Sequence, residues 1–143
     1  MTGTKAVRVL IADDFPLLRE VIRLYLERAA DMEVIDEAPD LDDALERSKT
    51  LRPDVIIMND YLPPIDSAHA TARFREQGST AAVLIISMHL EPDQIRRSFA
   101  SGANGFMHKD EIDDQLVAAV RLVHHGERYI SPKARDAYGS MQE

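Results

Sequence analysis

Short apolar runs alternate with amphipathic stretches along the chain. Five short runs of four to six residues predict β-strands, at residues 7–12, 33–38, 54–59, 82–87 and 105–108. Between and after them, apolar residues recur at the spacing of a helix that packs on a sheet, at residues 18–29, 41–51, 67–76, 92–100 and 112–123. The pattern therefore predicts five strands that alternate with five helices.

Single residues indicate where several of these helices begin and end. Asp40 precedes an amphipathic stretch and is predicted to cap its N-terminus, because Asp side chains accept hydrogen bonds from free helix amides. Pro53 ends the same helix, since proline disfavours helical geometry in the residue before it. Gly102 is predicted to close the fourth helix.

Strict alternation of strand and helix predicts a parallel sheet, because each helix returns the chain to the same edge. Strands that are apolar throughout indicate a sheet covered on both faces, which is a doubly wound, three-layer α/β domain. Ligands of such domains bind beyond the carboxyl ends of the strands. The polar positions to consider are therefore those that follow the predicted strands: Asp13, Asp14, Asn59, Asp60, Ser87 and Lys109.

These side chains have complementary chemistry. The carboxylates of Asp13 and Asp14 and the amide oxygen of Asn59 are hard oxygen ligands that suit Mg²⁺. The Ser87 hydroxyl and the Lys109 ammonium are groups that can stabilise a phosphoryl oxygen. Taken one at a time, each is an ordinary polar residue of a strand end or surface; together they predict a phosphoryl-handling site.

Composition and charge exclude several classes of function. The chain has 143 residues, of which 45% are hydrophobic and 29% charged, as in a single globular domain. Without cysteine it has no disulfides, thiolate metal sites or thiol nucleophiles. A formal charge of −8 argues against direct binding to nucleic acid. No run approaches a membrane span and no apolar signal region precedes residue 7, so we expect a cytoplasmic protein that does not contact membranes.

Four stretches together resemble the receiver domain of two-component response regulators, most closely the branch with a LuxR/NarL-type helix-turn-helix output. The stretches are residues 9–19, 53–58, 84–87 and 102–110, in the order and separation of that family. The likeness covers about residues 6–125 and implies a flavodoxin-like fold. Residues 126–143 resemble the connector that leads into the DNA-binding output domain of this branch, so we expect a receiver fragment of a longer regulator.

The resemblance also implies roles for single residues. Ser87 matches the hydroxyl that follows the phosphoryl group, and Phe106 falls at the position of a switching aromatic ring. Lys109 matches the lysine that pairs with the phosphoryl group. The Mg²⁺ ligands that the resemblance implies are the side chains of Asp13, Asp14 and Asn59 and the backbone carbonyl of Tyr61.

The chain departs from the family at the phosphate-accepting position. Counting back four residues from Pro63 places the family's acceptor aspartate at Asn59. A neutral amide is a poor nucleophile and cannot form an acyl phosphate, so phosphorylation should be impaired or absent. With one negative charge fewer, Mg²⁺ should bind weakly. Asp60 is a possible substitute acceptor, although strand alternation directs it to the opposite face unless a bulge re-aims it.

The expected function is a signalling module and not an enzyme. The resemblance implies contact with a sensor histidine kinase, dimerisation, and DNA binding only through an output domain outside this chain. One alternative is a stand-alone receiver that acts as a phosphorylation-independent scaffold. A Mg²⁺-dependent phosphohydrolase is disfavoured, because no second aspartate stands two residues after Asp13 or Asp14. No Gly-x-Gly-x-x-Gly motif follows the first predicted strand, which argues against a dinucleotide enzyme.

Overall fold

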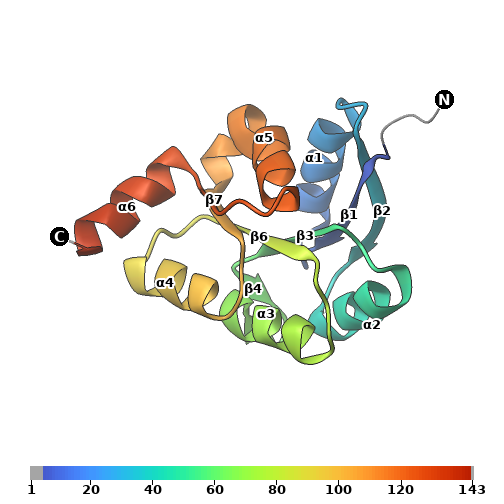
Figure 1. Ribbon diagram of the computed structural model, residues 1–143, viewed down its shortest axis with the longest axis horizontal. Helices are drawn as coiled ribbons and strands as arrows, with labels where there is room; N and C mark the ends of the chain where they lie inside the picture. The colour runs from blue at the N-terminus through green and yellow to red at the C-terminus, as the bar shows by residue number, and fades with distance from the viewer. Residues whose placement is uncertain (1–4, 143) are drawn as a thin grey trace.

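A sheet of six parallel strands forms the centre of the computed structural model, which describes residues 5–142 (Figure 1). Residues 1–4 and 143 lie outside the described residues. The expectation that no signal region precedes residue 7 rests partly on residues 1–4. The strands are β1 (Val7–Ala12), β2 (Met32–Ala38), β3 (Val55–Asn59), β6 (Ala82–Ser87), β7 (Gly105–His108) and β8 (Tyr129–Ile130). Their order in the sheet, β2-β1-β3-β6-β7-β8, is the doubly wound order with one strand added at the edge. The flavodoxin-like fold class is thereby confirmed.

Helices cover both faces of this sheet, as the pattern predicts (Figure 1). The helices are α1 (Pro16–Glu27), α2 (Leu41–Leu51), α3 (Ser67–Glu76), α4 (Pro92–Ala100), α5 (Ile112–His124) and α6 (Pro132–Gln142), with a short 3-10 helix η1 (Lys109–Glu111) before α5. Helices α1 and α5 pack on one face, and α2, α3 and α4 on the other (Figure 1).

The core consists of two layers, one on each side of the sheet. Ile11 and Ile57 point towards α1 and α5, whereas their neighbours Leu10 and Ile56 point towards α2, α3 and α4. All four side chains are at most 1% exposed. Because successive strand residues face opposite sides, only a strand that is apolar throughout can bury both faces.

The predicted helix ends agree with the local geometry. The Asp40 carboxylate accepts a hydrogen bond from the amide of Asp43 at 2.9 Å, which confirms it as the N-cap of α2. Gly102 follows α4 with a φ of 107°, a left-handed conformation that glycine adopts without strain.

A short hairpin occupies the segment between β3 and α3, which the pattern assigned to no strand. It pairs β4 (Tyr61–Leu62) with β5 (Ile65–Asp66) through a cis peptide bond between Pro63 and Pro64. Leu62 is fully buried, and the carbonyl of Pro63 accepts a hydrogen bond from the amide of Leu41 at 2.9 Å. The hairpin is therefore anchored to α2 beside the carboxyl end of β3.

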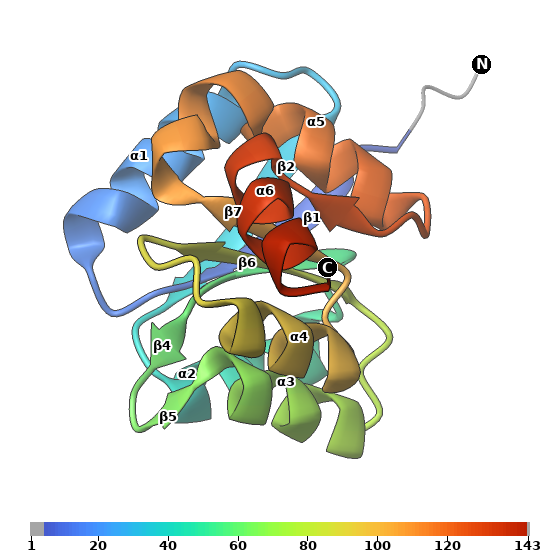
Figure 2. The same ribbon diagram turned by 90° about the vertical axis from the view of Figure 1, so that its left-hand side faces the viewer.

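The segment after α5, which the family resemblance predicts to be a connector, contains β8 and α6. The amide of Tyr129 donates to the carbonyl of Asn104 at 2.9 Å, and that of Ser131 to the carbonyl of Phe106 at 3.0 Å. Figure 2 shows α6 beside α4. Helix α6 contacts both α4 and β7, and its Ala134 is fully buried. This segment therefore packs against the domain as an added strand and helix.

Candidate functional site

The acidic pair lies directly after β1, beside the point where the strand order reverses. Asp13 is 1% exposed, whereas Asp14 is exposed to solvent. The Asp13 carboxylate accepts a hydrogen bond from the amide of Phe15 at 2.9 Å, which fixes its orientation. One carboxylate is thus held inside the protein and the other is free to face a ligand.

Burial dominates the electrostatics of Asp13. It raises the pKa of this carboxyl group to about 6, because an ionised carboxylate loses its hydration inside the protein. The hydrogen bond from Phe15 and the positive charge of Lys109 partly oppose this rise in pKa. Lys109, half-buried at the start of η1, therefore acts on the buried carboxylate of Asp13 across the carboxyl edge of the sheet.

A second group of site residues is joined by hydrogen bonds at the ends of β3 and β6. Asn59 is half-buried, and its side-chain oxygen accepts from the amide of Asp60 at 2.9 Å. The carboxylate of Asp60 accepts from the hydroxyl of Ser87 at 2.8 Å, and Ser87 is fully buried. Strand alternation alone would direct Asp60 to the opposite face. Because β3 ends at Asn59 and the chain bends at Asp60, the Asp60 carboxylate instead reaches Ser87 at the end of β6.

The other two candidates lie at different depths. Phe106 is fully buried in the core layer beneath α4 and α6, where it packs among apolar side chains. Tyr61 begins the hairpin; the residue is 48% exposed and its backbone pairs with that of Asp66. The aromatic ring of Phe106 therefore lies inside the domain, while Tyr61 lies at the rim of the site.

The oxygen donors of the site fit a divalent cation only in part. Within residues 5–142, no three Asp, Glu or His side chains gather into a metal-binding group. The carboxylates of Asp13 and Asp14 and the amide oxygen of Asn59 are the donor types that Mg²⁺ prefers, but the set carries only two formal charges. Because cation affinity depends on the number of charged ligands, this donor set favours weak binding.

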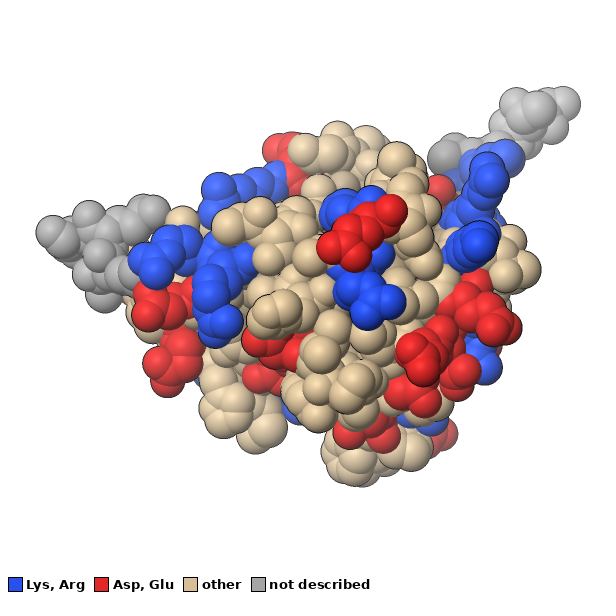
Figure 3. Space-filling model, turned by 90° about the horizontal axis from the view of Figure 1, so that it is seen from below, with Lys and Arg blue, Asp and Glu red and all other residues tan. Residues whose placement is uncertain are grey.

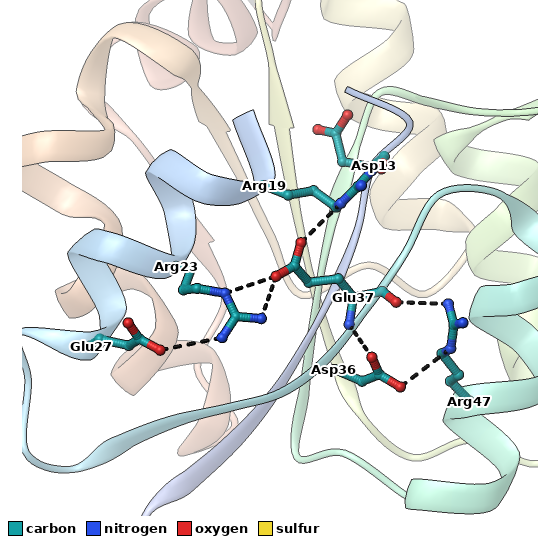
Figure 4. A network of polar contacts seen from close by, with 7 residues as sticks. All are labelled: Asp13, Arg19, Arg23, Glu27, Asp36, Glu37 and Arg47. Carbon is teal, nitrogen blue, oxygen red and sulfur yellow. Dashed lines mark hydrogen bonds and ion pairs between the residues drawn. The ribbon is translucent and has the colours of Figure 1, made fainter. Parts of the chain in front are cut away.

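A network of charged side chains behind Asp13 was not singled out from the sequence (Figure 4). The guanidinium of Arg19 donates to the backbone carbonyl of Asp13 at 2.6 Å and to the Glu37 carboxylate at 2.9 Å. Arg23 also donates to Glu37, and Arg47 donates to the backbone carbonyl of Glu37 at 2.7 Å. The sequence contains one signal for this network, which is a pair of arginines one helical turn apart, Arg19 and Arg23, followed by a predicted strand with three acidic residues.

These arginines determine the protonation of Glu37. Burial alone would raise its pKa, but hydrogen bonds from Arg23 and Arg19, together with their positive charges, hold the pKa of Glu37 below its ordinary value. Glu37 therefore remains ionised and ties α1 to β2 beside the acidic pair.

Basic and acidic side chains are mixed on one face of the molecule (Figure 3). On the face seen in Figure 3, Lys and Arg side chains are interspersed with Asp and Glu side chains. This distribution agrees with the formal charge of −8 and does not favour direct contact with a nucleic-acid backbone.

Comparison with known proteins identifies the family to which this chain belongs. Residues 9–121 match the family model described as "Response regulator receiver domain". The chain belongs to this family. The match includes the acidic pair of the receiver domain, Asn59, Ser87 and Lys109.

Relatives place the receiver domain in the LuxR/NarL branch. It is 34% identical over 128 residues to the oxygen regulatory protein NreC of Staphylococcus carnosus, covering 89% of this chain and 59% of the relative. It is 35% identical over 126 residues to the probable transcriptional regulatory protein NarL of Mycobacterium tuberculosis, covering 88% and 58%. A two-component response regulator of the LuxR family from Aurantimonas superposes with a TM-score of 0.91 at 28% identity, covering 96% of this chain and 99% of that one.

The receiver domain therefore spans less than two thirds of the length of these two curated relatives. In the part of the chain that the structure describes, no helix is both long and apolar enough to cross a membrane.

Proposed function

We propose that this receiver domain is the cytoplasmic signalling module of a longer response regulator and works without an acyl phosphate at residue 59. The regulator would control transcription through a DNA-binding output domain outside this chain. The relatives support this proposal, because their names describe regulatory proteins and about two fifths of their length lies outside the matched region. Residues 6–125 form the receiver in this proposal, and 126–143 connect it to the output domain.

The proposal depends on the identity of residue 59, which is asparagine in this chain. An aspartate at this position would attack phosphorus through a carboxylate oxygen, whereas the amide of Asn59 is a poor nucleophile. In addition, the amide oxygen already accepts a hydrogen bond from the amide of Asp60. The output would then be set by the population of receiver conformations and by bound partners.

The remaining site residues keep supporting roles in this proposal. Asp13 and Asp14, with the amide oxygen of Asn59 and the backbone carbonyl of Tyr61, would hold Mg²⁺ weakly. Such a cation would supply positive charge for an incoming anion. A sensor histidine kinase would contact the domain without transferring a phosphoryl group, and a second copy would form a homodimer.

Ser87, Phe106 and Lys109 complete the proposed site. Ser87 and Lys109 would contact an anion bound at the carboxyl edge of the sheet. Ser87 and Phe106 would together form the switch. Because Phe106 carries no hydroxyl group and is fully buried, its alternative positions would differ only in packing.

Intact-mass measurement tests the proposal. The chain and its Asn59→Asp variant are incubated with Mg²⁺ and a small acyl phosphate donor, with Asn59→Ala as the control. Only the Asn59→Asp variant should gain the mass of one phosphoryl group. A labile adduct on the unaltered chain that maps to Asp60, the possible substitute acceptor, would overturn the proposal.

A second candidate function is a phosphorylation-independent scaffold that acts without an output domain. Three large apolar side chains near the carboxyl edge favour it, because they offer a surface to a partner: Phe15, Leu17 and Met88 are 53%, 60% and 61% exposed. Expression of the complete gene product separates the two functions, since only a regulator of transcription requires a DNA-binding domain on the same polypeptide.

A further inference from the structure

The negative charge beside Ser87 comes from Asp60 and not from residue 59. Ser87 is fully buried, and its hydroxyl lies 2.8 Å from the Asp60 carboxylate. The same hydroxyl oxygen lies 2.8 Å from the carbonyl of His89 and accepts from the amide of His89 at 2.9 Å. A hydroxyl has one proton, so it donates either to Asp60 or to His89, and an ionised carboxylate is the stronger acceptor. Asp60 therefore determines the orientation of the Ser87 hydroxyl, which lies at the start of the loop after β6.

His108, the last residue of β7, makes a second contact with the loop after β6. The imidazole Nδ1 of His108 accepts from the amide of Asp110 at 3.0 Å, which leaves the proton of a neutral ring on Nε2. Nε2 lies 3.1 Å from the carbonyl of Met88 and can donate to it. The loop is thus connected to β3 through Ser87 and to β7 through Met88.

His108 also connects to the N-terminus of α6. Its backbone amide donates to the hydroxyl oxygen of Ser131 at 3.3 Å, and this oxygen also accepts from the amide of Ala134 at 3.4 Å. Two acidic residues of η1, which follows His108, also contact the start of α6. The Asp110 carboxylate pairs with the Lys133 ammonium at 3.1 Å, and the Glu111 carboxylate accepts from the Lys133 amide at 3.3 Å.

Contacts further along α6 fix it against α4. The ring of Tyr138 on α6 lies 6.5 Å from that of Phe99 on α4, and the guanidinium of Arg128, which precedes β8, lies 3.9 Å from the ring centre of Phe99. Figure 2 shows the resulting position of α6 beside α4. The docking of α6 therefore combines these ring contacts with the hydrogen bonds around His108.

We propose that Asp60 is a positioning residue: its bond to Ser87 is the first link of a polar chain, through Met88, His108 and Ser131, that stabilises the docked position of α6. The inference rests on the proposed function in one respect, that residue 59 carries no phosphoryl group to attract the Ser87 hydroxyl. The carboxylate of Asp60 takes the place of that phosphoryl group as the acceptor of the Ser87 hydroxyl. Any segment that follows α6 would then be held in one orientation without phosphorylation.

Hydrogen exchange tests this chain of contacts. Asp60→Ala should speed amide exchange in α6 by about 3- to 10-fold, the factor expected when a typical net hydrogen bond is lost from a local opening equilibrium. Residues 88–91 should respond in the same direction. The control is Asp42→Ala, which removes the same charge from an exposed site on α2 and should leave α6 unchanged.

A double-mutant cycle distinguishes coupling between Asp60 and His108 from a general loss of stability. His108→Phe alone should also speed exchange in α6, and Asp60→Ala combined with His108→Phe should have little more effect than the larger single change. Every α6 rate is divided by that of β1, so a global loss of stability cancels. Additive effects of the two changes, faster exchange in residues 88–91 with α6 unchanged, or an unchanged ratio of α6 to β1 would each overturn the inference.

No phosphoryl donor enters this experiment. A phosphoryl adduct on the unaltered chain would therefore contradict the proposed function without changing these rates. Conversely, an unresponsive α6 would contradict only the role of Asp60.

Discussion

Arg19 on α1 donates a hydrogen bond to the backbone carbonyl of Asp13 at 2.6 Å, so a helix outside the site holds the strand end that carries the acidic pair. The same guanidinium reaches Glu37 on β2 at 2.9 Å. The planar guanidinium can satisfy both acceptors at once, which a lysine ammonium does with less geometric precision.

Replacing this guanidinium should destabilise the domain. We expect Arg19→Ala to lower the free energy of unfolding by about 1–3 kcal/mol, because Glu37 loses a charged partner and the Asp13 carbonyl loses its donor. Arg19→Lys should recover less than half of that loss. Urea denaturation measures both, with Lys49→Ala on the exposed side of α2 as the control. Equal stability of the Arg19→Ala and Lys49→Ala variants would remove Arg19 from the support of the site.

Glu37 should contribute stability that depends on pH. Its folded pKa lies below the unfolded value of about 4.5, so its ion pairs stabilise the fold above that pH and the contribution is lost as the pH falls through the folded pKa. Glu37→Gln should therefore cost about 1 kcal/mol at neutral pH, and the difference from the unaltered chain should shrink below pH 4.5. Denaturation midpoints across this range, with the exposed Glu33→Gln as the control, measure the effect. A difference that stays constant with pH would contradict it.

Close packing around one glycine gives a prediction about the core. A Cβ at Gly105 would lie 2.8 Å from Leu84 and 3.0 Å from Val123, so Gly105→Ala should destabilise by about 1–3 kcal/mol. Nothing lies within 4 Å of a Cβ at Gly139 in α6, where alanine should instead stabilise by about 0.5–1 kcal/mol through its helix propensity. Thermal unfolding of the two variants should shift in opposite directions.

The layers of the fold could be predicted from residues such as Leu10 and Ile11. Adjacent apolar residues in a short run require a sheet covered on both sides, and the two core layers separate these two side chains as expected. Parallel strands then bring residues that follow them, such as Asp13 and Lys109, to one edge. Sheet geometry alone thus suffices to predict this part of the architecture.

The contacts of Asp60 and His108 could not be predicted in the same way. Alternation applies only inside a strand, and Asp60 is the first residue after β3, where the bend of the chain decides its direction. The bond from His108 to Met88 depends on a ring rotamer and tautomer that no spacing specifies. Among residues 132–139 of α6, the apolar side chains packed against the domain are two alanines and one tyrosine, which is too weak a periodicity to predict docking.

The remaining prediction concerns the charge missing from residue 59. Asn59→Asp adds a third carboxylate to a donor set that already includes Asp13 and Asp14, and Coulomb attraction to Mg²⁺ increases with each negative ligand. We expect at least about a tenfold gain in Mg²⁺ affinity, or about 1.4 kcal/mol. Titration calorimetry measures it, and Gln77→Glu, which adds the same charge at the C-cap of α3, is the matched control. The gain should disappear when Asp14→Asn is combined with Asn59→Asp, because the added carboxylate acts only together with the pair after β1. A gain of the same size in Gln77→Glu would instead attribute it to the net charge of the protein and not to the site.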